Sequence, residues 1–161
     1  MAIKVGDKLP DGRFTVMNDD GPGSLTTDDL FTGKKVVLFA VPGAFTPTCS
    51  NDHLPGFIEK ADEIRGKGID IIACMAVNDV FVMDAWGKDS GAGDKVMLLA
   101  DGNGDYAKAM GLDFDGSGFG LGTRCQRFAM VVDDGVVSEL LLEENPGELK
   151  ASSADKVLSK L

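Results

Sequence analysis

Two short apolar runs, separated by a helical pattern, constrain the fold of this chain more than any other feature of its sequence. The runs cover residues 36–41 and 71–77, and neither contains a charged side chain. Strands that are apolar on both faces are typical of parallel sheets with helices on each side. Between the runs, apolar residues recur at helical spacing over residues 54–64, where Pro55 is expected to kink the helix. The order strand–helix–strand predicts an α/β protein.

The rest of the chain adds strands and helices to this unit. Further strands are expected at residues 96–100, 127–132 and 136–141. The last two flank an Asp-Asp-Gly turn at residues 133–135, which is a strong hairpin signal. Helix caps are expected at Asn78-Asp79, before a helix through Trp86, and at Ser152-x-x-Asp155. We expect one domain over residues 1–161, with a central mixed β-sheet flanked by helices.

The acidic composition limits the partners of the chain. Its 161 residues carry 16 Lys and Arg against 26 Asp and Glu, a net charge of −10. Nucleic-acid binding depends on clustered basic residues, and an anionic membrane surface repels an acidic protein. The longest apolar run, residues 71–77, is too short to span a bilayer, and the first residues contain no secretory signal. We therefore expect a cytoplasmic protein with no nucleic-acid and no membrane partner.

Three cysteines are spread widely along the chain, at Cys49, Cys74 and Cys125. Their odd number and the lack of a C-x-x-C pair disfavour a disulfide scaffold, a structural zinc site and a thioredoxin-like disulfide reductase. Three free thiols are expected in a reducing compartment, and no metal is expected to bind them. The remaining question is whether one of the thiols is reactive.

The segment over residues 41–50 has the features of a reactive-thiol loop. It joins the first apolar strand to the helix, and ligand sites of open α/β sheets lie at such strand ends. Cys49 falls in the first helical turn, where free backbone N–H groups and the helix dipole favour a thiolate. Thr46 can donate a hydroxyl hydrogen bond, and Pro42 and Pro47 stiffen the loop. On these local signals alone, a small core residue is the commoner role for such a cysteine.

The motif Pro42-x-x-x-Thr46-x-x-Cys49 resembles the active-site signature of the peroxiredoxins. The segment that follows, residues 53–57 (HLPGF), is similar to the type-II or peroxiredoxin V group, and the likeness continues to residues 127–132. The resemblance implies a thioredoxin-like fold and a thiol peroxidase acting on hydrogen peroxide and alkyl hydroperoxides. It also implies that no metal, haem or flavin cofactor is needed, because the cysteine itself is oxidised and reduced.

The resemblance assigns roles to four residues. Cys49 matches the peroxidatic cysteine, which attacks a hydroperoxide and becomes a sulfenic acid. Thr46 matches a hydrogen-bonding threonine, Arg127 the arginine that stabilises thiolate and peroxide, and Pro42 the proline that shields the pocket. Arg124 is the other candidate for the role of Arg127. Residues three apart on a strand point to opposite faces, so only one of the two arginines can face Cys49. The family pattern favours Arg127, and we expect a salt bridge within a loop for Arg124.

Three other features have simpler interpretations. His53, the only histidine, lies four residues after Cys49, and packing or hydrogen bonding near the site is favoured over catalysis. Residues 101–105 (DGNGD) resemble the start of a calcium loop but lack the Gly and Glu that an EF-hand needs, so a polar turn before a helix is expected. The glycines of residues 116–122 lack dinucleotide-binding spacing and predict a mobile loop.

The sequence leaves open how Cys49 is reduced again. Some type-II peroxiredoxins use a second cysteine in the C-terminal segment, but Ala151 stands at the matching position. We therefore expect an external thiol, glutathione through glutaredoxin, to be the reductant. The alternatives are a thioredoxin-recycled enzyme with Cys74 or Cys125 as resolving thiol, and a redox-sensing protein without high turnover. Cys74 lies in a strand expected to be buried, whereas Cys125 is expected at a more mobile loop–strand boundary.

The helix expected after residue 79 is apolar on too many sides for a single buried stripe. Its apolar residues are Val80, Phe81, Val82, Met83, Ala85 and Trp86. A covering loop is one explanation, and a two-fold dimer is the other. Because relatives of the type-II group commonly pair through this edge, we expect a homodimer with Phe45 and Phe81 near the contact.

Overall fold

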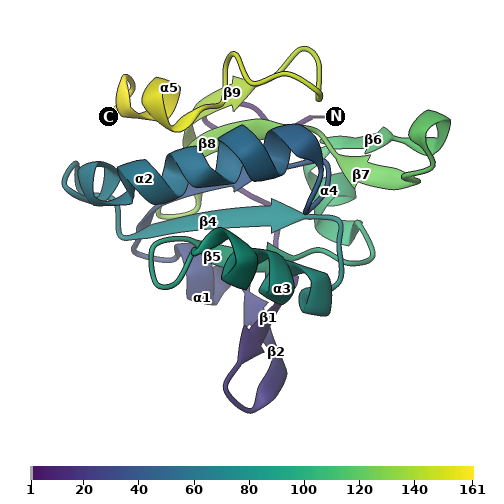
Figure 1. Cartoon of the computed structure of the whole chain (residues 1–161). Coiled ribbons are helices and arrows are strands. Elements are labelled where there is room, and N and C mark those ends of the chain that lie inside the picture. The colour runs from purple at the N-terminus through teal and green to yellow at the C-terminus, as the bar shows by residue number, and fades with distance from the viewer. Residues whose placement is uncertain (1) are drawn as a thin grey trace.

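A mixed sheet of seven strands forms the centre of the computed structural model, which describes residues 2–161 (Figure 1). The strands are β1 (Arg13–Asn18), β2 (Gly21–Thr26), β3 (Lys35–Ala40), β4 (Ile71–Ala76), β5 (Met97–Ala100), β8 (Phe128–Asp133) and β9 (Val136–Leu142). They lie in the order β2-β1-β5-β4-β3-β8-β9. β3, β4 and β5 are parallel, whereas β8 is antiparallel to β3. The predicted α/β fold with a mixed sheet is confirmed.

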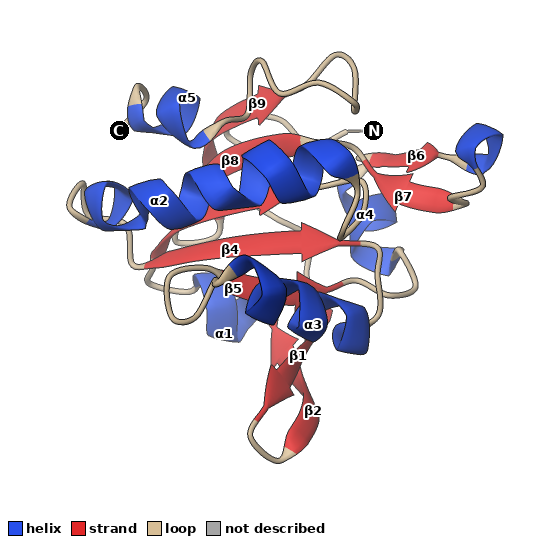
Figure 2. Cartoon of the chain, viewed as in Figure 1, coloured by secondary structure: helices blue, strands red, loops and turns tan. Residues whose placement is uncertain are grey.

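Helices cover both faces of the sheet (Figure 2). The helices are α2 (Leu54–Arg65), α3 (Val80–Ser90) and α5 (Ala154–Leu158) on one face, and α1 (Thr27–Phe31) and α4 (Asp105–Met110) on the other. Alternate residues of β3 enter two cores, so that Val37 packs under α2 and Val36 on the opposite side. Burial on both faces explains the continuous apolar sequence of the strand. No helix within residues 2–161 is long and apolar enough to cross a membrane.

Two hairpins belong to the sheet, and only one of them was predicted. In the β8–β9 turn, Asp134 and Gly135 have φ values of 49° and 81°, as a two-residue hairpin turn requires. The β1–β2 hairpin turns between Asn18 and Gly21 and projects from the body of the molecule (Figure 1). It escaped prediction because β2 has the sequence GPGSLT, and Gly and Pro are depleted in strands.

The glycine-rich segment, expected to be a loop, is the closed end of a third hairpin. β6 (Asp113–Asp115) and β7 (Thr123–Cys125) pair in antiparallel fashion on either side of it. Between them, Ser117–Phe119 form one turn of 3₁₀ helix, η2. The amide of Leu121 donates to Gly116 O at 3.0 Å, which closes the end of the hairpin.

One predicted helix cap is correct and the other is displaced by one residue. α3 begins after Asp79, whose carboxylate accepts from a backbone N–H three residues on. α5 begins after Ser153, whose Oγ accepts from Lys156 N at 3.2 Å. The predicted capping box at Ser152 is therefore wrong. The Ser152 hydroxyl instead donates to Glu143 Oε2 at 2.7 Å.

A π-helical turn, η1 (Cys49–His53), precedes α2. Its widened geometry is seen in the amide of Leu54, which donates to Cys49 O five residues back. Pro55 follows in the first turn of α2, where a missing N–H needs no partner. The irregularity expected at Pro55 thus takes the form of a π turn just before the proline, and this turn carries Cys49.

Candidate active site

The sulfur of Cys49 lies against two hydrogen-bond donors. Cys49 Sγ is 3.0 Å from Arg127 Nη2 and 2.9 Å from Thr46 Oγ1. Thr46 Oγ1 is also 2.7 Å from Gly43 O, so its single proton goes either to the sulfur or to that carbonyl. The Cys49 side chain is fully buried, so both donors meet the sulfur away from bulk water. The structure thus brings together three of the four residues proposed from the sequence.

Arg127 is a buried guanidinium held at three points. Its Nε donates to Pro146 O at 2.9 Å, its Nη1 lies 2.8 Å from His53 Nδ1, and its Nη2 reaches the sulfur. The residue is 1% exposed, and within residues 2–161 it forms no ion pair with Asp or Glu. A buried guanidinium without a carboxylate partner can stabilise negative charge that develops on a group in contact with it, and its Nη2 contacts Cys49 Sγ.

His53 fixes the guanidinium from behind. Its Nε2 lies 2.9 Å from Ser152 O, which can only accept, so Nε2 carries the proton and Nδ1 accepts from Arg127 Nη1. Burial, together with the adjacent Arg127 charge, lowers the pKa of His53 from 6.5 to about 3. His53 is therefore neutral at pH 7. It has the packing and hydrogen-bonding role expected from the sequence, and its ring centroid lies 4.9 Å from that of Phe39.

Arg124 holds the backbone of the loop rather than a carboxylate. Its Nη1 lies 3.4 Å from Pro42 O and 3.4 Å from Val77 O, and its Nε donates to Leu121 O at 2.9 Å. The expected salt bridge is wrong, because Arg124 pairs with no Asp or Glu within residues 2–161. The side chain ties Pro42, which is buried at the start of the loop, to the chain just after β4. As expected, only Arg127 of the two arginines faces Cys49.

Asn78 also positions this loop, which sequence reasoning did not foresee. Its Oδ1 accepts from the Ala44 amide at 2.9 Å, while the helix cap assigned to the Asn-Asp pair is supplied by Asp79. Phe45, which follows Ala44 in the loop, has a φ of 65° and is 51% exposed. A bulky residue in the left-handed region is uncommon and marks a backbone fixed by its surroundings.

Known proteins resemble nearly the whole length of this chain in sequence and fold. Residues 4–158 match the family model described as Redoxin. The chain is 52% identical over 165 residues to chloroplastic Peroxiredoxin-2E of Arabidopsis thaliana, which covers 99% of this chain and 70% of that protein. Peroxiredoxin-2B of the same plant is 48% identical, with 99% and 98% covered. The crystal structure of reduced Prx3 from Vibrio vulnificus in complex with H2O2 matches with a TM-score of 0.93 and 47% identity, covering 98% of both chains. This chain belongs to the peroxiredoxin family.

Membership confirms the fold and the enzyme class expected from the motif at Cys49. The sheet and helices of this peroxiredoxin are those of the thioredoxin-like superfamily. Its activity is that of a thiol-dependent peroxidase, which reduces a peroxide substrate and is then reduced by a partner.

The other two cysteines of this peroxiredoxin are sealed in the core. Cys74 lies in β4, in the same core cluster as Cys49, and burial together with the Cys49 charge raises its pKa well above 9.0. Cys125 ends β7 and is buried in the cluster on the opposite face of the sheet, where burial raises its pKa as well. Cys125 stands at the end of a strand, as expected, and its side chain is as fully buried as that of Cys74.

The acidic turn after β5 precedes a helix, as expected. Asp101 accepts hydrogen bonds from the amides of Tyr106 and Ala107 at 3.0 and 2.9 Å, so its carboxylate is occupied by the start of α4. Burial raises the pKa of Asp101 despite these bonds. Within residues 2–161, no group of three or more His, Cys, Asp or Glu side chains is placed to hold a metal ion.

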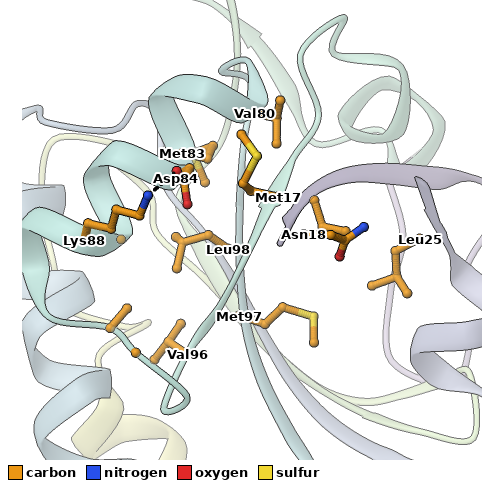
Figure 3. A pocket seen from close by; sticks show the side chains of 14 residues that line it. Met17, Asn18, Leu25, Val80, Met83, Asp84, Lys88, Val96, Met97 and Leu98 are labelled. Carbon is orange, nitrogen blue, oxygen red and sulfur yellow. Dashed lines mark ion pairs between the residues drawn. The ribbon is translucent and has the colours of Figure 1, made fainter. Parts of the chain in front are cut away.

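A surface pocket of about 380 Å³ lies between α3 and the β1–β2 hairpin (Figure 3). Apolar side chains of the helix, the hairpin and β5 form much of its wall, among them Met17, Met83 and Leu98. Asp84 and Lys88 of α3 also line it and form an ion pair at 3.0 Å. None of the four residues proposed for peroxide chemistry lines this pocket, so it is separate from the site at Cys49.

Sequence reasoning missed Glu143, which binds Ser152, the hydrogen-bond partner of His53. Glu143, just after β9, is 4% exposed, and its carboxylate accepts from the backbone of residues 150–152. Burial opposes its ionisation, but the hydrogen bonds from Ser152 and from the amides outweigh it and lower the pKa of Glu143 below 4.5. No side-chain spacing announces this contact, because most of its donors are backbone amides.

Proposed function

We propose that Cys49 is the peroxidatic cysteine and that Arg127 and Thr46 activate it. The thiolate attacks the terminal oxygen of a hydroperoxide, so that an S–O bond forms as the O–O bond breaks. The leaving oxygen takes a proton and departs as water or an alcohol. Cys49 is oxidised to a sulfenic acid while the peroxide is reduced by two electrons. Hydrogen peroxide and alkyl hydroperoxides are the proposed substrates, and the H2O2 complex of the Vibrio protein supports the first.

The convergence of two donors on one buried sulfur carries this proposal. Arg127 Nη2 and Thr46 Oγ1 lie 3.0 and 2.9 Å from Cys49 Sγ. A fixed guanidinium offers several donors in a fork, which suits a sulfur and two peroxide oxygens. Donors fixed in place before the reaction stabilise developing negative charge most strongly where water is excluded. Pro42, buried at the start of the loop, helps to keep water from the sulfur.

Glutathione, acting through glutaredoxin, is the proposed reductant. Position 151 is Ala, and its amide donates to Glu143 at 2.7 Å. Cys125 lies in the core on the other face of the sheet. A glutathione thiolate attacks the sulfenic sulfur, an S–S bond forms and water leaves; a glutaredoxin thiol then attacks the mixed disulfide and releases Cys49. Because Cys49 is fully buried, the π turn must open locally before glutathione reaches it.

A thioredoxin-recycled enzyme with Cys74 as resolving thiol is the second candidate. Cys74 shares a core cluster with Cys49, which favours it over Cys125 for this role. An internal disulfide needs the two Cα atoms within roughly 7 Å and well-directed side chains, and β4 would have to open to allow the exchange. A redox sensor without high turnover is the outcome if oxidation is fast but neither reductant restores Cys49.

Turnover with defined reductants tests this proposal. Wild type, Cys49→Ser and the double variant Cys74→Ser, Cys125→Ser are compared with glutathione and glutaredoxin, and then with thioredoxin. We expect Cys49→Ser to be inactive and the double variant to retain near-full turnover with glutaredoxin, with a glutathione adduct on Cys49 by mass spectrometry. If the double variant stalls after one peroxide per chain, an internal resolving cysteine exists and the glutaredoxin proposal is wrong.

A homodimer is proposed for the assembly, with a second copy covering the exposed aromatic residues near the site. Phe45 in the active-site loop and Phe81 on α3 are 51% and 65% exposed. Light scattering at micromolar concentration should give twice the chain mass for wild type. Phe81→Glu, which places a charge at the contact, should give the monomer. A wild-type monomer would contradict the proposal.

Two further properties of this peroxiredoxin are proposed. The cytoplasm is the proposed location, because three unpaired thiols fit a reducing compartment. Fractionation of cells of the source organism checks it, and recovery from an organelle would contradict it. Residues 1–161 are proposed to fold as one unit, so that urea unfolding followed by fluorescence and by circular dichroism should give coincident single transitions.

A further inference from the structure

We propose that Glu143 is a positioning residue for the peroxidase reaction, because its buried carboxylate sets the backbone that aims His53, and through it Arg127, at Cys49. The inference rests on the proposed roles of Cys49 and Arg127. Glu143 itself touches neither the sulfur nor Arg127 with its side chain, and it acts through the segment that precedes α5.

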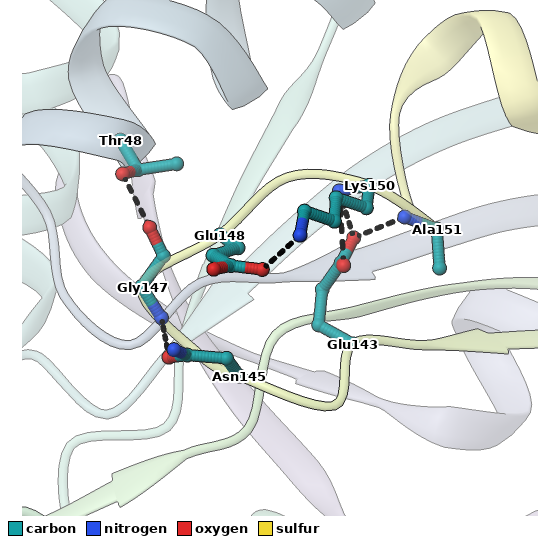
Figure 4. A network of polar contacts seen from close by, with 7 residues as sticks. All are labelled: Thr48, Glu143, Asn145, Gly147, Glu148, Lys150 and Ala151. Atoms are coloured by element: carbon teal, nitrogen blue, oxygen red, sulfur yellow. Dashed lines mark hydrogen bonds and ion pairs between the residues drawn. The ribbon is translucent and has the colours of Figure 1, made fainter.

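The Glu143 carboxylate binds three consecutive residues as a clamp, and Figure 4 shows its contacts with the first two, Lys150 and Ala151. Its Oε2 accepts from Ala151 N and Ser152 N at 2.7 Å each, and from Ser152 Oγ at 2.7 Å. Both of its oxygens lie near Lys150 N, at 3.0 and 3.1 Å. Charge-assisted bonds of this kind are about twice as strong as neutral ones, and here they are made in a site only 4% exposed. The backbone of residues 150–152 therefore has one preferred position.

The clamp is transmitted to the guanidinium by a chain of direct contacts. Ser152 O accepts from His53 Nε2 at 2.9 Å, which fixes the tautomer and the orientation of the ring. His53 Nδ1 then accepts from Arg127 Nη1 at 2.8 Å, and Arg127 Nη2 is left to reach Cys49 Sγ at 3.0 Å. Glu143 can therefore orient Arg127 through Ser152 and His53 without contacting the substrate itself.

The segment from Glu143 to Gly147 contacts Arg127 as well, at its backbone and at its guanidinium. The Glu143 amide donates to Arg127 O at 3.0 Å, and Pro146 O accepts from Arg127 Nε at 2.9 Å. Gly147 O accepts a hydrogen bond at 2.9 Å from Oγ1 of Thr48, the residue before Cys49. Figure 4 shows this segment between the Thr48 turn and the clamp. Loss of the clamp would therefore loosen Arg127 on two sides.

The sign of one measurable shift separates positioning from a plain electrostatic effect. Glu143→Gln removes a negative charge and places an amide N–H against the donors of the clamp. If Glu143 acted only as a charge, its loss would favour the Cys49 thiolate and move the pH profile of Cys49 oxidation to lower pH. If Glu143 positions Arg127, its loss weakens the bond to the sulfur and moves the profile to higher pH. A purely structural residue would lower the melting temperature and leave the profile unchanged.

The experiment measures the rate constant for oxidation of Cys49 by hydrogen peroxide from pH 4.5 to 9 in the full chain. For Glu143→Gln we expect the midpoint to rise by about one pH unit, which is about a tenfold loss of rate below the midpoint. Glu148→Gln is the matched control. Glu148 carries the same charge in the same segment, but among the described residues its carboxylate pairs with the Lys150 ammonium alone, and the two side chains are 46% and 77% exposed. Its midpoint should equal that of wild type.

A double-mutant cycle tests the route of the coupling. His53→Asn can keep an acceptor for Arg127 but cannot reach Ser152 O, so the route is cut. In that background, Glu143→Gln should shift the midpoint by less than half as much as it does alone. If Glu143→Gln does not fold, Ser152→Ala replaces it, since it removes only the hydroxyl contact, and its midpoint should rise by a smaller amount.

Three results would overturn the inference: an unchanged or lowered midpoint in Glu143→Gln, an equal rise in Glu148→Gln, or a full shift in the His53→Asn background. Failure of the proposed function gives a different result, because wild-type Cys49 would then react no faster than a free thiol. Fast wild-type oxidation with an unshifted Glu143→Gln profile defeats the positioning role alone.

Discussion

Acid should destabilise this protein through His53, its only histidine. Burial and the adjacent Arg127 lower the pKa of His53 from 6.5 to about 3 in the folded chain. Between these two values the unfolded chain binds a proton that the folded chain does not, so stability rises with pH across this window. The contribution is complete above pH 6.5 and is lost progressively as the pH falls towards 3.

The size of the effect follows from the two pKa values. Lowering the pH from 7 to 4 should remove about 3 kcal/mol of stability through His53 alone. The side chain is fully buried, so solvent screening does not reduce this figure. A loss of this size is a large part of the ~5–15 kcal/mol that stabilises a typical domain. Protonation would also cost the acceptor that Nδ1 offers to Arg127.

Urea unfolding at pH 7, 6, 5 and 4 measures the effect, with the fluorescence of the buried Trp86 as the signal. Other groups titrate in the same range: the lowered pKa of Glu143 acts in the same direction, and the raised pKa of Asp101 acts against it. His53→Asn has no titrating group at position 53, so subtracting its free energy of unfolding from that of wild type at each pH cancels the contributions of Glu143 and Asp101. The stability difference between wild type and variant should shrink by about 3 kcal/mol from pH 7 to pH 4. A difference that stays constant over this range would refute the argument.

Three further substitutions have expected results of different kinds. Arg127→Ala should slow oxidation of Cys49 by about 100-fold at pH 7, and high pH should recover only part of the rate because the guanidinium also binds the peroxide; full recovery in a stopped-flow pH series would show that it only promotes thiolate formation. Gly135→Ala places a side chain at a φ of 81° and should cost about 1–2 kcal/mol, a fall in Tm of about 2–8 °C by calorimetry. Asp79→Ala removes the cap of α3 and should cost about 1 kcal/mol in urea unfolding, whereas an unchanged midpoint would show that the cap contributes nothing.

The strands and helices that were predicted correctly are those whose burial is written in the sequence. β3 after Lys35 and the whole of β4 are apolar because each strand has a core on both sides, and the β8–β9 turn has residues that tolerate positive φ. The β1–β2 hairpin was missed because β2, the edge strand, contains two Gly and a Pro, which are depleted in strands. The burial of Cys125 was not predicted, because a three-residue strand does not reveal which face its side chains take.

The site divides in the same way. Cys49 and Thr46 are three residues apart, so their spacing along the chain is enough to indicate that the two side chains meet. Arg127 lies 78 residues from Cys49, and only the family resemblance indicated it. Glu143 could not be predicted, because its contacts are mainly with backbone amides, which every residue except proline carries. Long-range contacts of side chains with backbone leave little trace in a single sequence.

Stopped-flow fluorescence tests most directly whether Cys49 is the thiol that reacts with peroxide. The chain has one tryptophan, and Trp86 Nε1 donates to Ser50 Oγ at 2.9 Å, next to Cys49. Oxidation of Cys49 should therefore change the Trp86 signal at a rate proportional to peroxide concentration and far above that of a free thiol. The change should persist in the Cys74→Ser, Cys125→Ser double variant and vanish in Cys49→Ser. A fast signal that survives in Cys49→Ser would contradict the account.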